Sequence, residues 1–72
     1  MNVKVIDARG LSCPQPAAMA KQAMTGAGAG AIDVLVDSAT ARENVARIAR
    51  LAGWEATVAE EAAGEYRICL RK

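Results

Sequence analysis

The fold follows most directly from the stretch Val3-Lys-Val-Ile-Asp-Ala-Arg-Gly-Leu-Ser-Cys-Pro-Gln-Pro16. Its first part, residues 3–7, is short and rich in β-branched side chains, which is typical of a strand. Arg9-Gly10 is expected to turn the chain. Ser12-Cys13-Pro14 has the pattern of a helix start, a small polar cap followed by a proline. The stretch therefore predicts a strand that turns into a helix, with Cys13 at the beginning of that helix.

The rest of the chain continues with further strands and helices. The expected elements are a helix over 17–24 that the glycines of 25–30 end, a strand over 31–36, a helix over 41–52, a strand over 54–60, a hairpin loop over 61–64 and a strand over 65–71. Residues 31–36 are almost all apolar, which suits a central strand. In 65–71, apolar Tyr66, Ile68 and Leu70 alternate with Arg67, Cys69 and Arg71, as in a strand with one buried face.

The order β-α-β-α-β-β predicts an α+β fold with two layers. Each helix has one apolar stripe, so both are expected to cover one face of a four-stranded sheet. The chain of 72 residues has the length of one small domain, so residues 1–72 are expected to form a single domain. A core this small leaves no room for a buried cofactor, and none is expected.

Composition excludes several classes of function. The net charge of +1 gives no basic footprint for nucleic acid. No apolar run approaches the length of a membrane span, and residues 1–6 lack the apolar core of a signal peptide, so a cytoplasmic protein is expected. The chain has no histidine and only two cysteines, far apart, which argues against a metal site and against Cys-His proteases.

Cys13 is the candidate reactive residue. A thiol reacts as its thiolate, and a position at a helix N-terminus lowers its pKa because free N–H groups and the helix dipole favour negative charge. Pro14 and Pro16 fall in the first turn, where a missing N–H breaks no helical bond, and they stiffen the segment. Arg9, four residues upstream, could add positive charge.

Each candidate also has a plainer interpretation. Cys13 could be a small buried hydrophobic residue, although its Ser-Cys-Pro context is polar. Asp7 could act near the thiol or could satisfy N–H groups of the loop, and Gly10 is expected to serve backbone geometry. Cys69 lies in mid-strand without a cap or base and is expected to be structural.

The stretch Asp7-Ala-Arg-Gly-Leu-Ser-Cys-Pro-Gln-Pro16 resembles the TusA/SirA family of sulfur-carrier proteins, whose hallmark is Cys-Pro-x-Pro preceded by Asp-x-x-Gly-Leu. Cys13, Pro14 and Pro16 match the motif, as do Asp7 and Gly10. The ending Gly64-Glu-Tyr-Arg-Ile-Cys-Leu-Arg-Lys72 also resembles the family's last strand. Residues 36–53 look more like the YedF-type branch, which is linked to selenium metabolism and is often followed by a DsrE-like domain.

The resemblance implies a mixed sheet of order 1-2-4-3 and a persulfide on Cys13. The sulfur would come from a cysteine desulfurase or a rhodanese and pass to an acceptor protein, such as a DsrE-like one. The pathway could be tRNA thiolation, cofactor assembly, sulfur oxidation or selenium metabolism, and the chain could be part of a longer protein. The role is that of a sulfurtransferase-type carrier rather than an autonomous enzyme.

Two other functions stay open. The first is a small regulatory module that binds protein or nucleic acid and has a structural Cys13. The second is a redox enzyme, although residue 16 is proline where a Cys-x-x-Cys motif needs cysteine.

Overall fold

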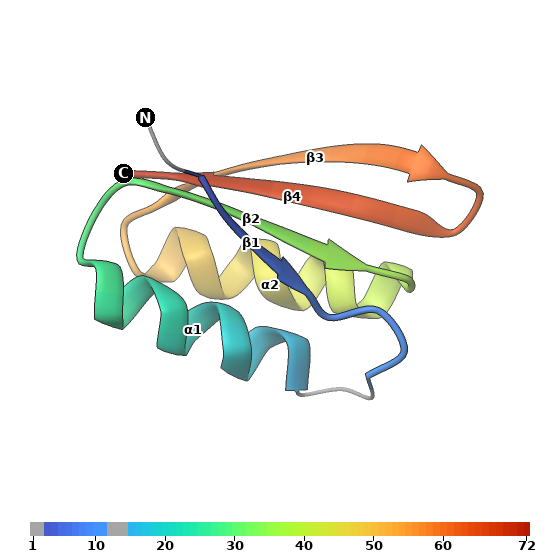
Figure 1. Cartoon of the computed structure of the whole chain (residues 1–72), viewed down its shortest axis with the longest axis horizontal. Coiled ribbons are helices and arrows are strands. Elements are labelled where there is room, and N and C mark those ends of the chain that lie inside the picture. Colours follow the sequence, from blue (N-terminus) through green and yellow to red (C-terminus); the bar gives the residue numbers. More distant parts are fainter. Residues whose placement is uncertain (1–2, 12–14) are drawn as a thin grey trace.

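The protein is an open sheet covered on one face by two helices (Figure 1). A computed structural model describes residues 3–11 and 15–72. Its elements are β1 (Lys4–Asp7), α1 (Gln15–Ala27), β2 (Ala31–Val36), α2 (Ala39–Leu51), β3 (Glu55–Ala62) and β4 (Glu65–Arg71). The sheet order is β1-β2-β4-β3, with β1 parallel to β2 and the other pairs antiparallel. The expected two-layer fold and its strand order are confirmed.

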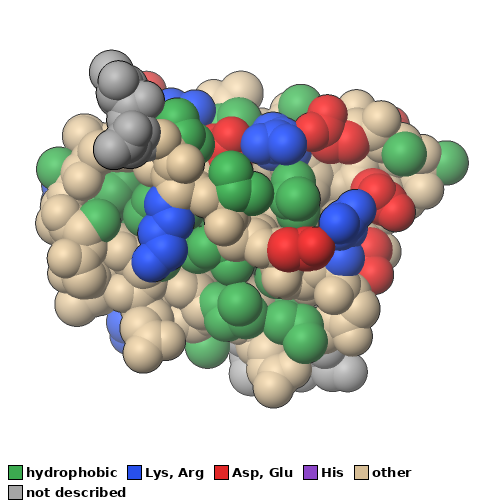
Figure 2. All heavy atoms as spheres, in the orientation of Figure 1, with side chains coloured by type: hydrophobic (Ala, Val, Ile, Leu, Met, Phe, Trp, Pro, Cys, Tyr) green, Lys and Arg blue, Asp and Glu red, His purple; other side chains and the backbone are tan. Residues whose placement is uncertain are grey.

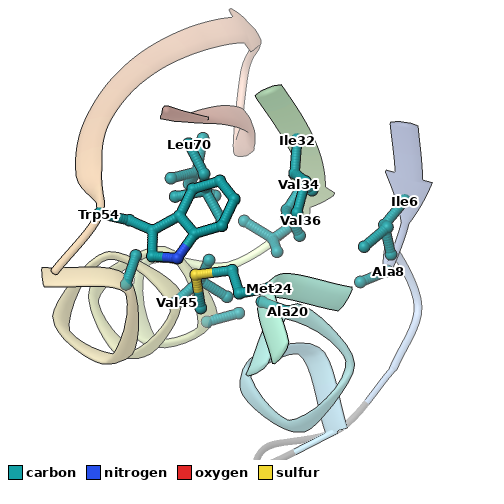
Figure 3. Packing of buried hydrophobic residues seen from close by; sticks show 13 residues of the cluster. Ile6, Ala8, Ala20, Met24, Ile32, Val34, Val36, Val45, Trp54 and Leu70 are labelled. Atoms are coloured by element: carbon teal, nitrogen blue, oxygen red, sulfur yellow. The ribbon is translucent and has the colours of Figure 1, made fainter. Parts of the chain in front are cut away.

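The core lies between the sheet and the two helices (Figure 3). It consists of Ile6, Ala8, Ala20, Met24, Ile32, Val34, Val36, Ala41, Val45, Ala49, Trp54, Ile68 and Leu70. Its alanines, such as Ala20 and Ala49, are fully buried and leave room for the helices to approach the sheet closely. Trp54 and Met24 point toward one another and close the core between the helices and the sheet (Figure 3).

The opposite face of the sheet carries charged side chains. Asp33, in the central strand β2, is only 7% exposed and accepts hydrogen bonds from Arg67 at 2.8 Å and Arg71 at 2.9 Å. The alternation expected for 65–71 is confirmed, because Ile68 and Leu70 are fully buried while Arg67 and Arg71 lie on the charged face. The two arginines thus tie β4 to β2 across the uncovered face.

Several predicted boundaries are wrong by one to three residues. Helix α1 runs to Ala27 instead of ending near residue 24, because the glycine with positive φ that stops it is Gly28 (φ 75°), whose N–H donates to the Met24 carbonyl. Strand β3 begins after Trp54, and it reaches Ala62, so the hairpin turn is tighter than the expected loop. Helix α2 begins two residues earlier than expected, directly after Ser38.

The parallel pairing of β1 and β2 brings several loops to one end of the sheet. Both strands finish at this end, and α1 and α2 begin there (Figure 1). Strand β4 starts at the same end, because Tyr66 pairs with Val36 in antiparallel register. We call this the loop end and define it by residues 7–11, 37–38 and 65–66. It is where the chain leads from β1 toward Cys13.

Candidate functional site

The segment that leads to Cys13 is held by hydrogen bonds from its backbone N–H groups to the Leu35 carbonyl of β2 and to the Asp37 side chain just after β2. The N–H of Ala8, which is fully buried, donates to the Leu35 carbonyl at 2.8 Å and extends the pairing of β1 with β2. Gly10 has φ +79°, a conformation that side chains with a Cβ rarely adopt, and its N–H donates to Oδ2 of Asp37 at 2.8 Å. Gly10 therefore has the backbone role expected for it, with an additional partner in Asp37.

Asp7 and Arg9 form a local ion pair at the loop end. The Arg9 guanidinium contacts the Asp7 carboxylate through Nε at 2.9 Å and Nη2 at 2.8 Å, and the Arg9 N–H also donates to Asp7. These hydrogen bonds from the Arg9 side chain and backbone lower the pKa of Asp7 to about 2. Arg9 also lies 3.5 Å from Glu65, which begins β4. The positive charge of Arg9 is thus shared between two carboxylates.

Acidic and basic side chains therefore stand side by side at this end of the molecule. Figure 2 shows them intermixed over the region where β1 and β2 end, without a large field of one sign. Arg42, near the start of α2, adds a cation–π contact with its guanidinium 4.7 Å from the centre of the Tyr66 ring. A partner that docks here would meet paired charges and the partly exposed Leu11.

Of the predicted proline pair, Pro16 is described and Pro14 is not. Pro16 is the second residue of α1, in the first turn, and its side chain is fully buried. The proline therefore anchors the start of α1 in the core, a role that the sequence analysis did not assign to it. No acidic residue follows in the first turn of α1, so no side chain there offsets the positive end of the helix dipole.

Cys13, the central predicted residue, lies outside the described residues together with Ser12 and Pro14. The described supporting residues come together only in part: Asp7 ends β1, Arg9 and Gly10 lie in the loop after it, and Pro16 lies in α1. Asp37 was not among the site residues that the sequence predicted. Its bond to Gly10 follows from the parallel pairing of β1 and β2, because the loops after parallel strands meet at the same end of a sheet.

Cys69, the second cysteine, is a free and partly buried thiol in the middle of β4. It lies in register with Asp33 on β2 and Thr57 on β3. Burial raises the pKa of the Cys69 thiol, and the negative charge of Asp33 raises it further. Cys69 is therefore mainly protonated at neutral pH, a state that disfavours nucleophilic attack.

The described part of the chain holds neither a cluster of metal-ligating side chains nor a helix that could cross a membrane. Within residues 3–11 and 15–72, no three potential ligand side chains lie close enough together to hold a metal ion. In the same ranges, neither helix is long and apolar enough to cross a membrane.

Comparisons with known proteins identify the family. The family model described as sulfurtransferase TusA matches residues 4–72. The crystal structure of a SirA-like protein from Desulfitobacterium hafniense is similar, with a TM-score of 0.89 and 30% sequence identity, over 97% of this chain and 96% of that chain. No curated protein sequence matches. The resemblance to the TusA/SirA family is confirmed, while the likeness of residues 36–53 to the YedF-type branch stays a prediction.

Proposed function

The chain belongs to the TusA family of sulfurtransferases, and we propose that it carries sulfur as a persulfide on Cys13. The observation that carries the proposal is the match of the family model over residues 4–72, which includes the whole Cys-Pro-x-Pro motif at 13–16. A general role in sulfur transfer follows from the family. The persulfide on Cys13, its donor and its acceptor are the further steps that we propose.

The proposed loading step is an exchange between a thiolate and a persulfide. The Cys13 thiolate attacks the outer sulfur of a donor persulfide, a new S–S bond forms, and the donor's S–S bond breaks. The donor leaves as a thiolate with the electron pair of the broken bond. Cys13 then carries the outer sulfur, with the proton that this sulfur bore in the donor, as Cys–S–SH, and a thiolate of the acceptor takes that sulfur in the same way. No external oxidant is needed, because one sulfur–sulfur bond replaces another.

Several features of the described residues support this chemistry. The first turn of α1 has no acidic residue, which leaves the positive end of the helix dipole available to a nearby thiolate. The Arg9 guanidinium pairs with the Asp7 carboxylate and compensates its negative charge. Asp7 therefore does little to disfavour a thiolate near this loop. Cys69 has a raised pKa and is partly buried, so it competes poorly for sulfur.

The partners of a carrier must reach its cysteine with their own active-site sulfur. We propose a persulfide-bearing donor, such as a cysteine desulfurase or a rhodanese, and a thiol-bearing acceptor, such as a DsrE-like protein. A reducing cytoplasm suits this function, because a free thiol persists there. Residues 1–72 would act as one domain that shuttles between the two partners.

The proposal is tested by measuring the mass of the intact protein after incubation with a cysteine desulfurase and cysteine. We expect the wild type to gain one sulfur atom that a reductant removes. Cys13→Ser should gain none, whereas the matched variant Cys69→Ser should load like the wild type. Equal loading of Cys13→Ser, or no loading of the wild type by either the desulfurase or polysulfide, would overturn the proposal.

A further inference from the structure

Asp37 links the two loops that follow the parallel strands. Its Oδ2 accepts the Gly10 N–H at 2.8 Å, although the two residues are 27 positions apart in the sequence. The bond joins the loop after β1 to the first residue after β2. Ala8, two residues earlier, donates its N–H to the Leu35 carbonyl of β2. The bond from Gly10 to Asp37 therefore holds the loop two residues beyond its last backbone hydrogen bond to β2.

The start of α2 does not need the Asp37 side chain. Ser38 is the N-cap residue of α2, with φ −149° and ψ 152°, and its hydroxyl accepts the Ala41 N–H at 3.1 Å. The Ser38 carbonyl accepts the Arg42 N–H at 3.0 Å. The usual function of an aspartate just before a helix is thus performed by its neighbour, and the carboxylate of Asp37 serves the other loop.

The position of Gly10 in the sequence gives this bond its significance. Gly10 stands three residues before Cys13, and Pro16 stands three residues after it. Pro16 is fixed because its side chain is fully buried in the core. Gly10 is fixed by its N–H bond to Asp37 and by its turn conformation at φ +79°. The described residues on either side of Cys13 are therefore both held in place, and Asp37 holds the one on the N-terminal side.

We infer that Asp37 is a positioning residue for Cys13, acting through its hydrogen bond to Gly10. The inference rests on the proposed function of Cys13 as a sulfur carrier. Sulfur transfer between two proteins requires the attacking thiolate to lie close to the outer sulfur and in line with the S–S bond that breaks. If the loop before Cys13 is less firmly attached, a smaller fraction of encounters has that geometry. Loss of the bond is expected to slow loading by roughly tenfold.

The test compares Asp37→Ala with Asp37→Asn, both in the Cys69→Ser background so that Cys13 is the only thiol. Asparagine retains a side-chain oxygen that can accept the Gly10 N–H, whereas alanine does not. In Asp37→Ala we expect faster hydrogen exchange of the Gly10 amide and loading by the desulfurase that is roughly tenfold slower. In Asp37→Asn both quantities should stay within about twofold of the parent protein.

Ser38→Ala is the matched control for a general loss of stability. It removes the cap of α2 and should lower the melting temperature, yet leave the Gly10 amide protected and the loading rate unchanged. Three results would overturn the inference: an unchanged Gly10 exchange rate in Asp37→Ala, an unchanged loading rate despite faster exchange, or a loading rate that falls equally in Asp37→Asn.

A further readout separates this inference from the proposed function. The pH profile of Cys13 alkylation by iodoacetamide needs no sulfur transfer. If the parent protein fails to load, the proposed function fails, and the alkylation profiles then decide the role of Asp37. A profile that shifts in Asp37→Ala and is restored in Asp37→Asn supports positioning, whereas identical profiles in all three proteins overturn it.

Discussion

Replacing Asp33 by asparagine tests how strongly the charged face of the sheet holds the fold. Asp33 is 7% exposed and accepts hydrogen bonds from Arg67 at 2.8 Å and Arg71 at 2.9 Å. Burial alone would raise the pKa of Asp33, but the bonds from Arg71 and Arg67 outweigh burial and lower it. The carboxylate is therefore charged in the folded protein, and asparagine removes that charge from between two arginines.

The expected loss of stability follows from these two bonds. A hydrogen bond to a charged group contributes about 1.5–3 kcal/mol, but water screens pairs whose partners are exposed. The side chains of Arg67 and Arg71 are 33% and 44% exposed, so the contribution of each bond must be reduced. We expect Asp33→Asn to lose about 2 kcal/mol, which lowers the melting temperature of so small a domain by roughly 10 °C.

The effect should depend on pH in a definite direction. Since the pKa of Asp33 is lowered on folding, its ionisation stabilises the protein above the ordinary pKa of an aspartate, and this stability is lost as pH falls through the lowered value. Thermal unfolding followed by circular dichroism should show the full difference at pH 7 and a smaller one below about pH 4. Glu60→Gln, at an exposed position of β3, is the control for loss of one negative charge. Equal melting temperatures at pH 7, or a difference that does not shrink in acid, would show that the ionised Asp33 does not stabilise the fold through these two bonds.

Two other predictions concern the loop end. An NMR titration of the Asp7 carboxyl should give a midpoint of about 2, and Arg9→Ala should return it toward the ordinary value of 3.8 because the hydrogen bonds from the guanidinium disappear. The stability that this pair contributes is present above the ordinary value and is lost as pH falls toward 2, and equal midpoints in the two proteins would contradict the pairing. Gly10→Ala should cost about 1 kcal/mol in urea unfolding, since a Cβ is disfavoured at positive φ. A Cβ there would meet no other atom within 4 Å, so an unchanged stability would mean that the turn is not kept in solution.

The sequence predicted the layers of the fold because hydrophobic periodicity determines which side chains can be buried. The alternation in 65–71 predicted a strand with one buried face, and the apolar run in 31–36 predicted a central strand. The structure has both. Helix ends were harder to predict. Glycines 26, 28 and 30 are all suitable for ending α1, and only Gly28 takes the terminating positive φ beside the Met24 carbonyl.

Contacts between elements could not be predicted from local patterns. The bond from Gly10 to Asp37 requires parallel strands, and the contact of Arg9 with Glu65 requires β4 to lie beside β2. Asp33 is a similar case, because an aspartate in an apolar strand gains its partners only when β4 places Arg67 and Arg71 on either side of Cys69, the residue opposite Asp33. The role of Cys13 was predicted by its motif, and it stays a proposal that only chemistry can test.

The most direct test of the central claim is to map the carried sulfur to one of the two cysteines. After loading by a cysteine desulfurase and capping with iodoacetamide, trypsin should release residues 10–21, which contain Cys13, and residues 68–71, which contain Cys69. One additional sulfur atom is expected on peptide 10–21 and none on peptide 68–71. Additional sulfur on peptide 68–71 alone, or on neither peptide, would contradict the central claim.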